Sequence, residues 1–205
     1  RVAMEAGADV AALCDTNGGM LPDEIADVVH DVLGATSARV GIHCHNDTGC
    51  AVANSMAAVQ SGVRHVQGTL NGLGERTGNA NLTTIIPNLQ LKLGYECLPP
   101  ANMERLTSVS NFVAEVLNRP LNPQAPYVGS SAFAHKAGLH VSAIARAKDA
   151  YEHIVPELVG NGTRFVVSEM AGRATIQMKA DELGLTMDGP AVNQVIDDLK
   201  RLEHE

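Results

Sequence analysis

Residues 39–47, Arg-Val-Gly-Ile-His-Cys-His-Asn-Asp, place two histidines one residue apart at the end of an apolar run. In a β-strand the side chains alternate between two faces, so His43 and His45 would share one face with Gly41. The opposite face would carry the apolar side chains Val40, Ile42 and Cys44. The polar turn at residues 46–49 leads into a helical pattern, so both histidines are predicted at the C-terminal end of a strand that feeds a helix.

This pair of histidines favours a metal site. Neutral imidazole is a common ligand of divalent transition metals, and two rings on one strand face lie about 7 Å apart along the strand, within reach of one ion. A histidine considered alone more often satisfies a hydrogen bond, and that alternative stays open for each ring. The spacing of His43 and His45 predicts that both bind one divalent cation.

The composition narrows the class of protein. The chain has 205 residues, 45% of them hydrophobic, with no long apolar run and no signal-peptide pattern, which is typical of a soluble globular protein. A formal net charge of −8 argues against a nucleic-acid or membrane partner and favours a small-molecule substrate. The four cysteines show no CxxC pairing, so they are expected to be reduced and the location cytoplasmic.

Three strand-turn-helix units are predicted in the first half of the chain. The expected strands are residues 9–14, 39–47 and 64–71, and the expected helices are residues 22–34, 51–61 and 80–94. Pro87 would either kink the last helix or mark its start. Three such units are typical of a parallel barrel or a doubly wound sheet, and both are α/β folds.

A complete (β/α) barrel takes about 250 residues, so only three of its eight units would be present. The chain also opens at Arg1 in what reads as the tail of a helix that ends at Gly7. We therefore expect a piece of a longer protein.

The pattern changes after residue 95. A helix is expected over 101–118, followed by an extended connector at 119–130 that contains three prolines. The remaining residues read as helical, with no further strand. The predicted domains are a partial barrel at 1–95, a helix and proline-rich connector at 96–130, and a helical lid or linker subdomain at 131–205.

Four stretches resemble a known family: GIHCHNDTGCAVAN from residue 41, NGLGERTGNANL from 71, FAHKAGLHVSAI from 133 and YEHIVPELVGN from 151. They resemble the acyl-CoA Claisen-condensing synthases of the DRE-TIM metallolyase superfamily, which includes 2-isopropylmalate, homocitrate and citramalate synthases. The last two stretches are most similar to bacterial citramalate synthases. The resemblance implies the C-terminal part of a TIM (β/α)8 barrel followed by a small, mainly α-helical domain.

It also implies an enzyme that condenses acetyl-CoA with a 2-keto acid and then hydrolyses the thioester. Pyruvate, which gives citramalate, is the expected keto acid, with the substrates of 2-isopropylmalate and homocitrate synthases as alternatives. The resemblance further implies a divalent cation, Mg, Mn or Zn, and a homodimer.

The family's site residues map onto six positions. His43, His45 and Asn79 would bind the metal, Thr16 would contact the keto acid, and His140 assisted by Tyr151 would remove the proton from acetyl-CoA. Alternatives remain open for two of them, because Asn79 could instead be the N-cap of the helix at 80–94, and Thr16 could form an ordinary turn.

Further expectations concern neighbouring residues. His135 competes with His140, because on one helix the two would point about 140° apart and only one could face the barrel. Two interpretations of His153 remain open: it contributes to the site, or it is a partly exposed histidine near the start of a helix. Glu75 and Arg76 are expected to pair and brace their loop.

The chain lacks the family's Asp-Arg-Glu strand, so it is expected to hold half a metal site and to be inactive alone. One alternative is a zinc hydrolase of the amidohydrolase type, which also uses a His-x-His strand. Another is a catalytically incomplete metal-binding or assembly fragment.

Overall fold

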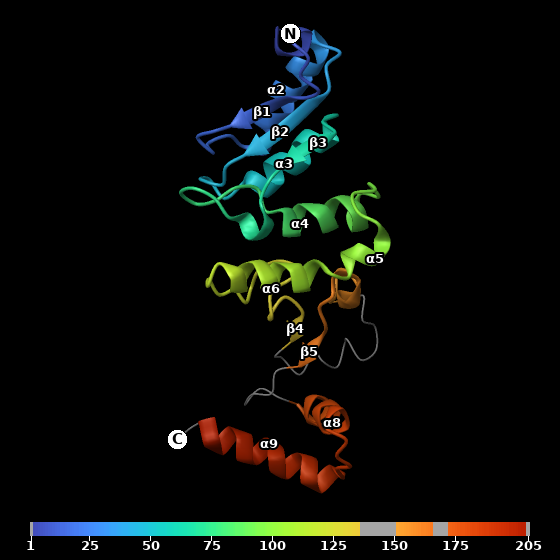
Figure 1. Cartoon of the computed structure of the whole chain (residues 1–205). Coiled ribbons are helices and arrows are strands. Elements are labelled where there is room, and N and C mark those ends of the chain that lie inside the picture. The colour runs from blue at the N-terminus through green and yellow to red at the C-terminus, as the bar shows by residue number, and fades with distance from the viewer. Residues whose placement is uncertain (1, 136–150, 166–171, 204–205) are drawn as a thin grey trace. The chain divides into compact units, whose positions relative to one another are not determined.

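The computed structural model describes residues 2–135, 151–165 and 172–203 (Figure 1). The chain divides into two compact units, Arg1–Leu121 and Asn122–Glu205. The domain boundaries that the sequence suggests at residues 95 and 130 stay predictions.

A three-stranded parallel sheet forms the centre of the first unit. Its strands are β1 (Ala11–Asp15), β2 (Val40–Cys44) and β3 (His65–Gln67), in the order β1-β2-β3. Cys14 pairs with His43, and His43 pairs with Gln67. Because β2 is the central strand, it is bonded on both sides and carries its histidine between two neighbours.

Helices follow the strands along the chain, and a helix comes after each strand as the sequence predicts. They are α1 (Val2–Glu5), α2 (Pro22–Ala35), α3 (Ala51–Gln60), the 3-10 turn Leu70–Gly72, α4 (Leu82–Pro87), the π-helical turn Asn88–Lys92, α5 (Pro100–Met103) and α6 (Leu106–Val116). Pro87 ends α4, and the helix continues in π geometry after it. Proline has no N–H to donate, so the regular hydrogen-bond ladder is interrupted there.

The core of the first unit lies on one face of the sheet. Val40, Ile42 and Cys44 are 3%, 1% and 0% exposed and pack with Val29 of α2 and Ala58 of α3. The predicted alternation of β2 is therefore confirmed, because these side chains share the apolar face. The histidine of the strand belongs to the other face.

The second unit contains two short strands that the sequence analysis did not expect. Strand β4 (Ala134–His135) pairs in parallel with β5 (Arg164–Phe165), so the expectation of no further strand is wrong. Strands of two residues are too short to show an alternating pattern. His135 therefore lies on a strand, and the comparison of helix angles with His140 does not apply to it.

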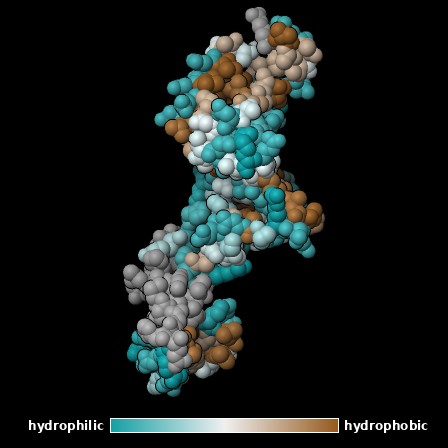
Figure 2. Space-filling view, turned by 90° about the vertical axis from the view of Figure 1, so that its left-hand side faces the viewer, coloured by the Kyte–Doolittle hydropathy of each residue, from teal (hydrophilic) through white to brown (hydrophobic). Residues whose placement is uncertain are grey.

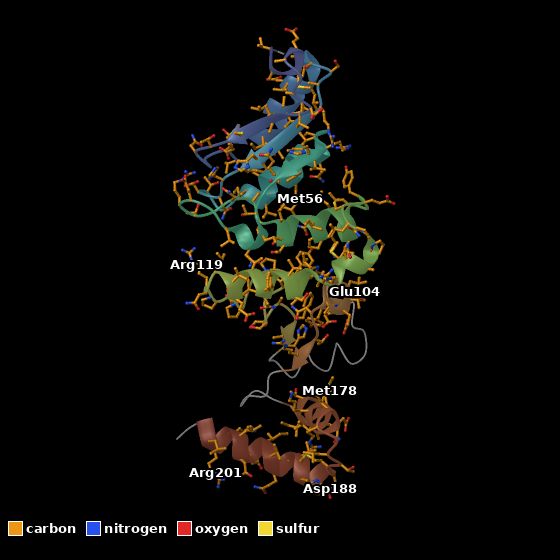
Figure 3. All side chains as sticks on the ribbon, in the orientation of Figure 1. Met56, Glu104, Arg119, Met178, Asp188 and Arg201 are labelled. Carbon is orange, nitrogen blue, oxygen red and sulfur yellow. The ribbon has the colours of Figure 1, made fainter. Side chains whose placement is uncertain are left out.

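Helices complete the second unit, which remains mainly helical. They are the 3-10 turn η4 (Pro156–Val159), α8 (Arg173–Glu182) and α9 (Gly189–Glu203). Ile176 of α8 packs against Val192 of α9. Asp188, labelled beside α9 in Figure 3, accepts a hydrogen bond from the Ala191 N–H at 2.9 Å, so it caps the start of this helix.

The connector at 119–130 is not simply extended. Asn122 accepts from the N–H of Ala125 through its carbonyl and from the N–H of Gln124 through its side chain, both at 2.9 Å. The Gly129 N–H donates to the Ala125 carbonyl at the same distance. The prolines exclude a helix but leave room for these successive turns, so the expectation of an extended connector is wrong.

Hydrophobic and hydrophilic residues share the surface (Figure 2). In the first unit Val2, Phe112 and Val116 are more than 60% exposed. Within the described residues, no helix combines the length and apolar character needed to cross a membrane.

Candidate functional site

Three turns meet at the C-terminal ends of the parallel strands, one after each strand of the sheet. The His45 N–H donates to the Asp15 carbonyl at 3.2 Å, and the Thr48 N–H donates to the Gly18 carbonyl at 3.2 Å. The Asn46 N–H donates to the Gly78 carbonyl at 2.9 Å. These bonds join the turns at residues 15–19 and 45–49 and the loop at 72–79 into one polar region.

The two histidines of the central turn lie close together. The ring centroids of His43 and His45 are 5.3 Å apart, and the ring planes meet at 69°. The Nδ1 atom of each ring is buried and has no hydrogen-bond partner among the residues that the structure describes. The alternative that these nitrogens merely satisfy hydrogen bonds is not what the structure shows.

Asn79 joins the histidines from the neighbouring loop. It forms an isolated β-bridge with His45, and the following N–H of Ala80 donates to the Cys44 carbonyl at 3.0 Å. The Asn79 side-chain oxygen is buried, and it too lacks a hydrogen-bond partner within the described part of the chain. Gly74 makes room for this side chain, since a Cβ at residue 74 would lie 2.9 Å from the Asn79 Cγ.

The structure assigns the helix cap to a different asparagine. The side-chain oxygen of Asn81 accepts from the Thr83 N–H at 3.0 Å and from the Thr83 hydroxyl at 2.7 Å. Helix α4 begins at Leu82, so Asn81 is its N-cap. The alternative that Asn79 caps the helix is therefore wrong, and its amide oxygen is not used for capping.

Thr16 lines an open cavity of about 740 Å³ beside this region. The residues that line it are Cys14, Asp15, Thr16, Asn17, Met20, Asp47 and Arg76, and the two histidines and Asn79 are not among them. In the described part of the chain the Thr16 hydroxyl forms no hydrogen bond, whereas Asn17 closes the turn by accepting from the Gly19 N–H at 2.9 Å. The turn therefore does not depend on the Thr16 side chain.

Asp15 was missed by the sequence analysis. It is 5% exposed and lines the same cavity as Thr16, and its buried Oδ2 atom has no hydrogen-bond partner in residues 2–135, 151–165 and 172–203. An acidic residue that ends an apolar strand of a parallel sheet is the signal that would have identified it.

The loop at 72–79 carries an ion pair that the sequence analysis assigned wrongly. Arg76 pairs with Asp47, not with Glu75: Nε lies 2.8 Å from Oδ1 and Nη2 lies 2.8 Å from Oδ2. The hydrogen bonds from Arg76 lower the pKa of the Asp47 carboxyl, and the same bonds raise the pKa of the Arg76 guanidinium. Residues next to each other in sequence cannot reveal a partner 29 positions away.

The second unit holds the other predicted residues. His140 lies outside the described residues, and Tyr151 is 45% exposed. The His135 Nε2 lies 3.5 Å from Oε1 of the buried Glu152, and Glu152 accepts from the Thr163 hydroxyl at 2.5 Å. A buried carboxylate thus lies beside His135 at the end of β4.

His153 contacts two aromatic rings of the same unit. Its ring lies 5.1 Å from that of Tyr127 in an edge-on arrangement and 5.8 Å from that of Phe133 in a stacked one. These contacts are enough to account for its position.

The donor set of the first unit fits part of a metal shell. His43 and His45 offer imidazole nitrogens and Asn79 offers an amide oxygen, all of them acceptable ligands for divalent cations. Across the residues that the structure covers, no three His, Cys, Asp or Glu side chains group closely enough to hold a metal. In the described part of the chain this set therefore consists of two imidazoles and one amide, which make up only part of a metal shell.

Two family models match the chain. The HMGL-like model matches residues 1–113, and the model of the homocitrate synthase post-HMGL domain matches residues 127–205. The boundary between these matches falls near the division between the two compact units.

Curated relatives match nearly the whole chain. It is 53% identical to the (R)-citramalate synthase of Aquifex aeolicus and 55% identical to that of Streptomyces coelicolor, over 99% of its length in each case. It is 37% identical to a probable 2-isopropylmalate synthase of Methanopyrus kandleri over 98% of its length. The chain spans 38–40% of these proteins.

Solved structures share the fold over 58% of the chain. The HMG-CoA lyase of Bacillus subtilis matches with a TM-score of 0.51 and 27% identity, over 58% of this chain and 41% of the lyase. The carboxyl transferase domain of Rhizobium etli pyruvate carboxylase matches with a TM-score of 0.50 and 26% identity, over 58% of this chain and 19% of that one. The predicted α/β class is confirmed. Because the matching model covers more than half of its residues, this chain belongs to the HMGL-like family.

Proposed function

We propose that this chain is part of an acyltransferase that condenses acetyl-CoA with pyruvate to give (R)-citramalate. The observation that carries this proposal is a set of three buried atoms with no hydrogen-bond partner among the described residues, the Nδ1 atoms of the adjacent rings of His43 and His45 and the side-chain oxygen of Asn79, which is bridged to His45. The high identity to curated (R)-citramalate synthases favours pyruvate over the other 2-keto acids.

The proposed metal ligands are His43, His45 and Asn79. A divalent cation bound there supplies Lewis-acid polarisation of the keto acid's carbonyl. The three residues offer no negative charge, so a carboxylate from elsewhere in the whole protein is expected to complete the site. Mg, Mn and Zn all accept nitrogen and oxygen donors of this kind, to different degrees.

Thr16 is proposed to bind the keto acid's carboxylate. Thr16 lines the open cavity at the end of β1, and its hydroxyl has a proton to donate. Asp15 lines the same cavity.

His140 is the proposed acceptor of a proton from the methyl group of acetyl-CoA, with Tyr151 assisting. An imidazole suits this step, because its ordinary pKa of about 6.5 lies near the working pH. The resulting enolate forms a carbon–carbon bond with the keto carbon while the carbonyl π bond breaks, and the keto oxygen takes up a proton. Water then cleaves the thioester to give a carboxylate and free coenzyme A. A cytoplasmic location and a homodimer belong to the same proposal.

The test is a chimera in which residues 1–205 replace the matching segment of the Aquifex aeolicus enzyme. Release of coenzyme A thiol is followed with acetyl-CoA and pyruvate, and in parallel with 2-ketoisovalerate and 2-ketoglutarate. We expect turnover that is fastest with pyruvate. Preference for either of the other keto acids would reassign the substrate, and an inactive chimera would contradict the proposal.

Matched variants locate the site within the chimera. His43→Ala and His45→Ala should each lower turnover by at least about 100-fold, since each removes a proposed ligand. His30→Ala, an exposed histidine on α2, is the control and should leave turnover unchanged. The 205-residue chain alone should show no thiol release, and activity in it would contradict its proposed role as one part of the site.

A further inference from the structure

The side chain of Arg76 joins all three turns at the end of the sheet. It belongs to the loop after β3, it bonds both carboxylate oxygens of Asp47 in the turn after β2, and its Nη2 donates to the Thr16 carbonyl at 2.8 Å in the turn after β1. Its bonds therefore span 29 and 60 positions of sequence. Arg76 is the residue through which the loop that carries Asn79 is bonded to the turn that carries Thr16.

The backbone around this contact is shaped to allow it. Arg76 itself has φ of +54°, a conformation that is uncommon for a residue with a side chain. A Cβ at Gly18 would lie 2.3 Å from the Asp47 Oδ2, and Gly18 has φ of +67°, so only glycine leaves space for the carboxylate at this point. An unusual backbone angle on one partner and an obligatory glycine beside the other indicate a contact that the fold maintains.

We propose that Arg76 is a positioning residue, which holds the Asn79 loop and the Thr16 turn at a set separation across Asp47. This inference rests on the proposed function, because it assigns Arg76 to the spacing between the proposed metal ligand and the proposed keto acid contact. Arg76 lines the same cavity as Thr16, and in this scheme its guanidinium bonds Asp47 and the Thr16 carbonyl to hold the two turns.

The guanidinium group is suited to this task in a way that lysine is not. Its Nε and Nη2 atoms bond the two carboxylate oxygens of Asp47 at once, and the second hydrogen of Nη2 is free to bond the Thr16 carbonyl. A lysine ammonium would keep the charge beside Asp47 but could not reproduce the fixed two-point geometry. Arg76→Lys therefore separates the effect of charge from the effect of shape.

A simple surface ion pair is the competing explanation. The side chains of Arg76 and Asp47 are 43% and 26% exposed, and exposed pairs contribute little to stability. Arg201 forms such a pair with Asp198 on α9 at 3.0 Å, with its side chain 69% exposed (Figure 3). Arg201→Ala is therefore the matched control, because it removes an exposed ion pair that joins no turns.

The first experiment is amide hydrogen exchange on the 205-residue chain, and it needs no activity. Arg76→Ala should speed exchange in residues 15–19 and 72–79 by about tenfold or more, while the amides of β2 keep the wild-type rate. The exchange rates of Arg76→Lys in these two segments should lie between those of wild type and Arg76→Ala. Arg201→Ala should leave the exchange rates of both segments unchanged. Exchange within twofold of wild type in Arg76→Ala, or equal acceleration throughout β2, would overturn the positioning role.

The second experiment uses the chimera and separates binding from turnover. Arg76→Ala should raise both the KM for pyruvate and the dissociation constant for Mn²⁺ by about tenfold, the lower end of the range for residues that support metal ligands. The KM for acetyl-CoA should stay within threefold, and Arg76→Lys should recover part of the loss. A fall in kcat with unchanged KM and metal affinity would overturn the inference.

The two experiments fail separately. If the chimera with the native segment releases no thiol, the proposed function fails, and hydrogen exchange still decides whether Arg76 holds the two turns together. If exchange is unaffected while the chimera is active, the function stands and the role of Arg76 is wrong.

Discussion

Asn79 and Asn81 are two residues apart, and the structure gives them different tasks that a pair of alanine substitutions can separate. Asn81→Ala removes the cap of α4 and leaves the Thr83 hydroxyl, in a residue that is 0% exposed, without its acceptor. Loss of a cap costs about 1 kcal/mol, and a buried polar group without a partner costs about 1–3 kcal/mol. The expected loss of stability is therefore about 2–4 kcal/mol.

Asn79→Ala should behave in the opposite way. Its side-chain oxygen is buried and unpartnered, so its removal takes away an unsatisfied group and should change the free energy of unfolding by less than about 1 kcal/mol. In the chimera the same substitution should weaken Mn²⁺ binding at least about tenfold, while Asn81→Ala should change it less than threefold.

The assay is thermal unfolding of the 205-residue chain followed by circular dichroism, together with Mn²⁺ titration of the chimera. For chains of this size about 2–4 °C of melting temperature corresponds to 1 kcal/mol, so Asn81→Ala should lower the midpoint by at least about 4 °C. Asn111→Ala, which removes an exposed amide bonded to the Thr107 carbonyl on α6, is the control for a surface substitution. Equal destabilisation by Asn79→Ala, or a larger loss of Mn²⁺ affinity in Asn81→Ala, would refute the assignment.

Three further outcomes follow from the same structure. Burial raises the pKa of the Cys44 thiol to about 11, so at pH 8 iodoacetamide should modify the exposed Cys14 and leave Cys44 intact, as mass spectrometry of the digested chain would show. Ile42→Ala removes a side chain that is 1% exposed and should lower stability by about 2–5 kcal/mol in urea unfolding, whereas a loss below 1 kcal/mol would contradict its place in the core. The hydrogen bond from Arg76 lowers the pKa of Asp47, so the charged pairing is present above the ordinary aspartate pKa and is lost only as the pH falls through the lowered pKa. The chemical shift of the Arg76 Nε–H in nuclear magnetic resonance should therefore keep its hydrogen-bonded value at pH 4 and move on further acidification.

The parts of the fold that depend on local periodicity were accessible from the sequence. The alternation of β2 separates His43 from the apolar side chains on either side of it, and this pattern is complete within five residues. The helical spacing that places Ile25 and Val29 inward is equally local, and both residues are in the core. Such patterns report directly which face of an element is buried.

The contacts between turns were not accessible in the same way. Arg76 pairs with Asp47 and not with Glu75 because of how two loops meet in space. Asn81 and not Asn79 is the cap because of the exact residue at which the helix begins, and helix starts are hard to predict to within two residues. Strands β4 and β5 pair across the chain and are too short for any pattern. The sequence therefore indicated which turns matter but not the bonds between them.

The loop that carries Asn79 begins and ends at nearly the same point. The Asn79 N–H donates to the Gly72 carbonyl at 3.2 Å, and a Cβ at Gly78 would lie 2.0 Å from that same carbonyl oxygen. The loop is thus closed at its base by this hydrogen bond and anchored at Arg76 by the bonds to Asp47 and the Thr16 carbonyl. An insertion between Gly72 and Arg76 should therefore disturb Asn79 less than a substitution of Gly78, because only the latter places a Cβ against the backbone that closes the loop.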